Sequence, residues 1–333
     1  MLAFGLSFAP ALNHGQRLAA PHPVVSRGGP YCVEARRSAV RMMSSSAAAA
    51  PSPSSGNGKP HGGAPEKHKK DKSIKLIGLL FAIVTFAWSI PLFCIMLVAH
   101  PFVKLFDAKQ RKFQDFISNL WCRLSMLTVG IKPRMIGAEN LPKKDEVVIY
   151  VANHTSFTDI YTMAWLDRRA KWVAKVEVLR IPIVGWAMQM TKHVCLQRGD
   201  RRAQLEAYRA MLQTLKDGNS LVVYPEGTRS SDGRLRRFQS GAFKAAKSVN
   251  VPVIPLTLLG TRDFMPASAY LPVQYPKNGV QIVVHPRIMP DHHTDAEMLS
   301  LAFEAIDSAL PRELQAGSAR VPAEGETSAG STV

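Results

Sequence analysis

The chain has 333 residues, 46% of them hydrophobic, so it can bury a sizeable core, and disorder along its whole length is excluded. Its 42 Lys and Arg against 25 Asp and Glu give a net charge of +17. Residues 1–75 alone hold 11 basic and 3 acidic residues, a net charge of +8 in less than a quarter of the chain. Such an excess predicts an anionic partner, either nucleic acid or an anionic membrane surface.

The first 65 residues have the composition of a disordered leader. They carry six basic side chains and a single acid, Glu34, and the stretch from Ser44 to Pro65 is dominated by Ser, Ala and Pro. A segment of this kind buries too little apolar surface to order itself. Arg- and Ser-rich, acid-poor N-termini are also typical of organelle transit peptides. Residues 1–65 are therefore either a transit peptide or a plain disordered tail.

A stretch of 24 residues without a charge, residues 76–99, follows a polybasic run at residues 66–75. About 20 helical residues cross the hydrocarbon of a bilayer, so this stretch predicts a membrane-inserting helix rather than a buried core helix. Basic residues flank it on both sides, so the positive-inside rule does not orient it. Pro91 is expected to break or kink the helix. A single span and a bent hairpin with both flanks on one face both remain open.

Residues 100–134 are predicted to be an amphipathic helical region. Apolar residues recur at helical spacing from Phe113 to Leu127 and form one stripe. The stripe can lie on the membrane interface, with Trp121 at headgroup level, or pack on the domain that follows. Membrane contact explains the basic flanks, and the sequence has no zinc-finger, RNA-recognition or basic-zipper pattern. We therefore expect a phospholipid bilayer as a partner and no nucleic acid.

Residues 135–314 alternate short apolar strands with helices, which predicts an α/β domain with a central mixed sheet and flanking helices. The predicted strands cover residues 146–152, 171–175, 194–197, 220–224, 253–258 and 280–285. The predicted helices cover residues 156–166, 201–216, 240–248 and 295–310, and residues 315–333 are predicted to be a second disordered tail. In such a sheet, functional sites form at the carboxyl ends of strands.

The first candidate site follows the first predicted strand of this domain, where the sequence from Asn153 to Asp159 reads N-H-T-S-F-T-D. The side chain of His154 can exchange a proton near neutral pH. Asp159, five residues later, cannot share a helix face with it, but the two meet if His154 lies in the turn and Asp159 in the first helical turn. The alternative is that Ser156 and Asp159 form a capping box beside an incidental histidine.

The second candidate site follows the predicted strand 220–224 and reads Y-P-E-G-T-R-S from Tyr224 to Ser230. Proline and glycine bracket a turn that exposes a glutamate and an arginine at the carboxyl end of the strand. The planar guanidinium of Arg229 suits a phosphate, and the hydroxyls of Thr228 and Ser230 add donors. The alternative is a surface turn whose charges are solvated.

These blocks and two others resemble the glycerolipid acyltransferases of the lysophosphatidate acyltransferase, or PlsC-like, type. The H-x4-D block stands at His154 and Asp159, and the P-E-G-T-R-S block at residues 225–230. A K-x-E…P-x-x-G-W block appears as Lys175, Glu177, Pro182, Gly185 and Trp186, and a V-P-V-I-P block as residues 251–255. The block that ends in Arg198 departs from the usual form, so only Arg198 is carried over. The resemblance covers about a third of the chain.

The resemblance implies transfer of a fatty acyl group from an acyl thioester to 1-acylglycerol 3-phosphate, which forms phosphatidate. His154 would be the general base, and Asp159 would orient the imidazole. Arg229 would bind the phosphate, with Lys175 or Arg198 adding a second charge. Glu226, Gly227 and Thr228 would shape the turn beneath the acceptor.

The resemblance leaves three alternatives to this reaction open, and it does not identify the acyl donor. The acceptor could be another lysophospholipid or glycerol 3-phosphate, or the fold could serve a lipid-binding protein without catalysis. The donor would be acyl-CoA or acyl carrier protein, and no other cofactor is needed. The composition of the N-terminal leader, and not the resemblance, predicts a plastid or other organelle membrane as the location, with the endoplasmic reticulum as the alternative.

We predict no metal site. The four cysteines lie far apart and form no C-x-x-C pair. The D-H-H-T-D run at residues 291–295 is interpreted as a helix start, because Thr294 and Glu297 have the spacing of a capping box.

Overall fold

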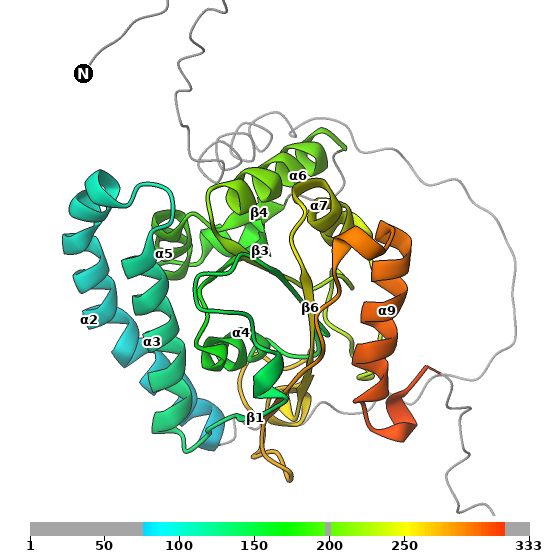
Figure 1. Cartoon of the computed structure of the whole chain (residues 1–333). Helices are drawn as coiled ribbons and strands as arrows, with labels where there is room; N and C mark the ends of the chain where they lie inside the picture. Colours follow the sequence, from blue (N-terminus) through cyan, green and yellow to red (C-terminus); the bar gives the residue numbers. More distant parts are fainter. Residues whose placement is uncertain (1–75, 197–200, 317–333) are drawn as a thin grey trace, which may run out of the picture.

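The computed structural model describes residues 76–196 and 201–316. These residues fold around a seven-stranded sheet (Figure 1). The leader predicted for residues 1–65, the polybasic run 66–75, Arg198 and most of the predicted tail lie outside these residues. The strands are β1 (Arg134–Ile136), β2 (Ile149–Ala152), β3 (Ala170–Lys175), β4 (Val194–Leu196), β5 (Ser220–Val223), β6 (Val253–Leu259) and β7 (Gln281–Val284).

The strands lie in the order β1-β7-β6-β2-β5-β3-β4. All neighbouring pairs are parallel except β6 and β7, which are antiparallel, so the sheet is mixed, as predicted. All four residues of β2 are buried, which is typical of a parallel strand covered on both faces. Because β2 and β5 are neighbours and parallel, their carboxyl ends and the turns that follow them meet at the same edge of the sheet.

Helices cover both faces of the sheet (Figure 1). They are α2 (Leu76–Phe106), α3 (Lys112–Thr128), α4 (Asp159–Met163), α5 (Val184–Thr191), α6 (Arg201–Lys216), α7 (Gly241–Val249), α8 (Thr261–Phe264) and α9 (Asp295–Ser308). Phe243 of α7 and Met298 of α9 pack with Ile149 of β2 in one apolar cluster. On the other face, Met163 of α4 packs with Tyr150 of β2.

The predicted strands and helices of the domain are present, but the short α8 is a further element that was not predicted, and the strand predicted over residues 146–152 is shortened to Ile149–Ala152. The three-residue strand β1 and the helix α5 were not predicted. The helix predicted over residues 156–166 is instead the short α4 followed by a 3-10 turn at Ala164–Leu166. The helix begins at Asp159 rather than at residue 156, because residues 154–158 form the turn that holds the candidate site.

Helices α2 and α3 lie side by side at the N-terminal end of the described chain (Figure 1). The indole nitrogen of Trp121 in α3 donates to the carbonyl of Thr85 in α2 at 2.9 Å. The helix α2 has 31 residues and carries no Asp, Glu, Lys or Arg before Lys104, so it is long and apolar enough to cross a membrane. It exposes a row of large apolar side chains, among them Phe86, Val98 and Phe102.

Of the break or kink predicted at Pro91, the break is not formed, because α2 continues through Pro91 and Pro101. Leu92 and Met96 of α2 pack in one cluster with Ile117 of α3 and Met190 of α5. This packing holds the helix together across the position where Pro91 lacks a backbone donor.

Candidate active site

The two candidate motifs meet at the carboxyl ends of β2 and β5. The backbone N–H of His154 donates to Oε1 of Glu226 at 2.7 Å, and the N–H of Ser230 donates to the carbonyl of His154 at 2.7 Å. The turn after β2 is therefore bonded directly to the turn after β5, although 72 residues separate His154 from Glu226. The parallel pairing of the two strands produces this contact.

His154 and Asp159 form a hydrogen-bonded pair, as the sequence predicts. Asp159 is fully buried and is the first residue of α4, and its Oδ2 lies 2.8 Å from Nδ1 of His154. The same oxygen accepts the backbone N–H groups of Thr155 and Ser156, each at 2.9 Å. Because the carboxylate can only accept, the proton lies on Nδ1, and Nε2 is left as the basic nitrogen.

The capping box considered for Ser156 and Asp159 is not formed. The N-cap of α4 is Thr158, and no side chain caps it. The hydroxyl of Ser156 donates instead to the carbonyl of Met265 at 2.7 Å, so this residue ties the turn to the segment after α8. The carboxylate of Asp159 is instead bonded to the imidazole of His154 and to the backbone N–H groups of Thr155 and Ser156.

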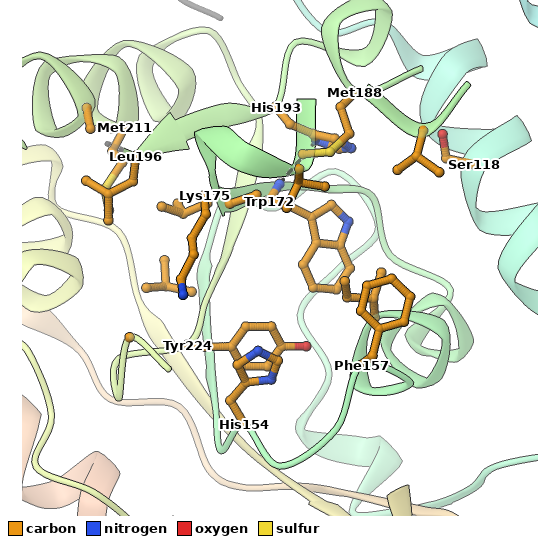
Figure 2. A pocket seen from close by; sticks show the side chains of 18 of the residues that line it. Ser118, His154, Phe157, Trp172, Lys175, Met188, His193, Leu196, Met211 and Tyr224 are labelled. Atoms are coloured by element: carbon orange, nitrogen blue, oxygen red, sulfur yellow. Dashed lines mark hydrogen bonds between the residues drawn. The ribbon is translucent and has the colours of Figure 1, made fainter. Parts of the chain in front are cut away.

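The imidazole plane of His154 is fixed by an aromatic neighbour that the sequence analysis did not single out. The ring of Tyr224 stacks on it with a centroid distance of 4.0 Å and an interplanar angle of 12° (Figure 2). Trp172 of β3 lies beyond Tyr224 at 6.1 Å. Asp159 thus sets the direction of the ring within its plane, and Tyr224 sets the plane itself.

The carboxylate of Glu226 is hydrogen-bonded to the turn that carries His154 and is not a free charge. Its second oxygen, Oε2, accepts the backbone N–H of Arg236 at 3.1 Å. Burial raises the pKa of Glu226 to about 7. The following residue, Gly227, has φ of 70°, a left-handed conformation that glycine adopts without strain. Together they shape the turn that carries Thr228 and Arg229.

A cavity of about 1030 Å³ opens beside this histidine. Of the residues proposed from the sequence, it is lined by His154, Lys175, Glu226, Gly227, Thr228 and Arg229. The side chain of Lys175 points into it (Figure 2). Asp159 lies behind His154, and Arg198 lies outside the described residues. The structure therefore brings together every candidate residue that it describes.

Sequence reasoning missed several residues that line the cavity, among them Phe157, Trp172, His193, Tyr208 and Lys244. Burial lowers the pKa of His193 to about 3, so it is a neutral acceptor for the backbone N–H of Trp172 at 3.2 Å. No local pattern marks these residues, because the cavity lies between elements that are distant in the chain.

The interpretation of residues 291–295 as a helix start is confirmed. The hydroxyl of Thr294 accepts the backbone N–H of Glu297, and the carboxylate of Glu297 accepts the N–H of Thr294. The two bonds are the reciprocal pair of a capping box.

The geometry defines a class of enzyme. Among the described residues, no serine or cysteine bonds to the imidazole of His154, so the pair is placed to activate a hydroxyl that the substrate supplies. The fold and this site are those of an α/β acyltransferase. In agreement, a family model described as "Acyltransferase" matches residues 132–259.

The chain belongs to the 1-acyl-sn-glycerol-3-phosphate acyltransferase family. It is 41% identical over 243 residues to such an enzyme of Chlamydomonas reinhardtii, covering 72% of each chain. It is 39% identical to the chloroplastic LPAT1 of Arabidopsis thaliana, covering 74% of this chain and 67% of the relative. The crystal structure of PlsC from Thermotoga maritima, an LPA acyltransferase, shares the fold with a TM-score of 0.60 at 24% identity. That match covers 72% of this chain and 97% of PlsC.

Proposed function

We propose that His154 is the general base of a lysophosphatidate acyltransferase. The free hydroxyl of 1-acylglycerol 3-phosphate attacks the carbonyl carbon of an acyl thioester while Nε2 of His154 takes its proton. The ester C–O bond forms, the C–S bond breaks, and the thiolate leaves with the proton that His154 returns. The products are phosphatidate and a free thiol. The observation that carries this proposal is the His154–Asp159 pair at a cavity that also holds Arg229.

Asp159 acts through His154. Its carboxylate holds the Nδ1–H tautomer and stabilises the imidazolium that forms when Nε2 takes the proton. Two backbone N–H groups fix the same carboxylate oxygen, so the pair is preorganised before substrate arrives. The substrate alcohol takes the place that a nucleophilic serine has in a hydrolase triad.

The acceptor phosphate is assigned to Arg229, with Lys175 as the second cation. Both side chains line the cavity, and neither forms a hydrogen bond or ion pair with the described residues. Arginine presents a planar fork of donors to phosphate oxygens, and lysine adds a point charge.

Replacing Arg229 by alanine is expected to raise the KM for lysophosphatidate about 10-fold to 100-fold and to change kcat less, because a hydrogen bond to a charged group is lost. Steady-state assays with a fixed saturating donor measure both constants. The control is Arg209→Ala, which removes an exposed arginine of α6 that does not line the cavity. Equal loss of kcat with an unchanged KM would refute the phosphate role.

The apolar face of α2 is assigned to the membrane. Its large side chains are exposed along one side, while Ser89, Leu92 and Met96 near its middle line the cavity. A helix that lies in the bilayer surface beside α3 would place the cavity next to the lipids that supply the acceptor. This arrangement favours insertion from one side of the membrane over a single span.

The membrane is assigned to a plastid, on two grounds. The relatives from Arabidopsis thaliana and Brassica napus are named chloroplastic, and the leader has the composition of a transit peptide. Residues 1–75 fused to a fluorescent protein are expected to direct the fusion to plastids in leaf cells, as seen by overlap with chlorophyll fluorescence. A diffuse cytosolic signal would contradict the transit peptide.

A further inference from the structure

The cavity extends to both sides of the catalytic histidine. Figure 2 shows Phe157 and Met188 on one side of the His154–Tyr224 stack, and Leu196 and Met211 on the other. The first side is bounded by α2, α3 and α5 and is largely apolar. The second side is bounded by α6 and α7 and is lined by both apolar and polar residues.

The side between α6 and α7 combines an apolar floor with a polar mouth. Buried Ala207 and Met211 of α6 and Ala242 of α7 form the floor. The exposed Gln204 of α6 and Lys244 of α7 line the same region. A slender ligand with both amide and apolar groups fits such a lining better than a fatty acyl chain does.

The charges on the cavity wall are unbalanced. Three cations line it, Lys175, Arg229 and Lys244, and none forms an ion pair within the part of the chain that the structure describes. Glu226 is the one acid among the described lining residues, and backbone N–H groups occupy both of its oxygens. The acceptor supplies one phosphate, which Arg229 and Lys175 can bind. Lys244 is left for a second anion.

The start of α7 adds to the positive potential at Lys244. The first helical residues, Gly241 and Ala242, line the cavity, and the side chain of the N-cap residue Ser240 makes no capping bond. A Cβ built on Gly241 would meet no atom within 4 Å, so the backbone there is open to a ligand. A helix N-terminus attracts anions, which reinforces the lysine.

We propose that the side between α6 and α7 binds the phosphopantetheine arm of the acyl donor, with Lys244 contacting its phosphate; this rests on the proposed function. Both acyl-CoA and acyl carrier protein present their acyl group on this arm, so the site serves the chemistry that the two donors share. The thioester then lies beside His154, and the acyl chain extends into the apolar side toward Phe157 and Met188.

Lys244→Gln is expected to raise the KM for the donor about 10-fold or more and to leave the KM for lysophosphatidate unchanged. The effect should appear with each of the two donors, acyl-CoA and acyl carrier protein, that the wild type uses, and should vanish with acyl-pantetheine, which lacks the phosphate. The matched control is Lys216→Gln, which removes an exposed lysine at the far end of α6 outside the cavity. An equal effect with acyl-pantetheine, an effect on only one of two donors that the wild type uses, or a raised KM for lysophosphatidate would overturn the assignment.

A binding measurement separates this proposal from the catalytic one. A thioether analogue of acyl-CoA is titrated calorimetrically into His154→Ala and into His154→Ala/Lys244→Gln, where no turnover occurs. Weaker binding to the double variant supports the site, and equal binding overturns it. A wild-type protein that fails to acylate lysophosphatidate would overturn the proposed reaction instead, whatever the titration shows.

Discussion

His154→Ala is expected to lower the rate of acyl transfer about 10²-fold to 10⁴-fold, the range that a positioned general base contributes. The substitution removes the nitrogen that takes the hydroxyl proton and leaves Asp159 bonded to the N–H groups of Thr155 and Ser156. The turn should therefore keep its shape. Initial rates of phosphatidate formation from radiolabelled acyl donor measure the loss.

Two controls make this result specific. The variant should bind anionic phospholipid vesicles as the wild type does in flotation assays, because α2 and its exposed apolar face are untouched. His292→Ala, which removes an exposed histidine outside the cavity, should keep full activity. Transfer by His154→Ala at more than a tenth of the wild-type rate would refute the general-base mechanism.

The sequence indicated this pair, beside the alternative of a capping box, because the constraint is local. His154 and Asp159 are five residues apart, and a turn followed by a helix start is the geometry that brings them together. The position of Arg229 beside the cavity was predictable for a similar reason, since Pro225 and Gly227 bracket a turn at the end of a strand.

What the sequence could not show is how distant elements share the cavity. Tyr224 was visible only as the end of a strand, and its stacking on His154 depends on the pairing of β2 with β5. Lys244 lies in the middle of an ordinary amphipathic helix, and only the packing of α6 and α7 beside β5 places it at the cavity. Periodicity indicates which face of a helix is buried, but it does not indicate which cavity an exposed residue borders.

Lys171 is a further residue whose role depends on long-range packing. It was predicted as the first residue of a strand, yet its side chain is 1% exposed and its ammonium bonds both oxygens of Asp115 in α3, at 2.8 and 2.7 Å. It also donates to the carbonyl of Gln110 at 2.6 Å. Burial lowers the pKa of Lys171. The pair therefore joins the helix next to α2 to the strand that carries Trp172 and Lys175 into the cavity.

Lys171→Met is expected to lower the free energy of unfolding by about 3–5 kcal/mol, because it leaves the carboxylate of Asp115 buried without its counter-charge. The double variant Lys171→Met/Asp115→Leu should recover most of this loss, since two apolar side chains of similar volume can pack where the ion pair lay. Urea unfolding of the detergent-solubilised protein, followed by tryptophan fluorescence, gives the three free energies.

An exposed ion pair serves as the control for the buried pair of Lys171 and Asp115. Lys144 lies 3.4 Å from Asp167, with side chains 74% and 59% exposed, so Lys144→Met should change the free energy of unfolding by less than about 1 kcal/mol. A double Lys171/Asp115 variant as unstable as the single one would mean that the site needs its hydrogen bonds, including the one to Gln110, and not only charge neutrality. If the double variant is stable but has lost acyl transfer, the ion pair positions β3 in the cavity. If it is stable and active, the pair only joins α3 to the sheet.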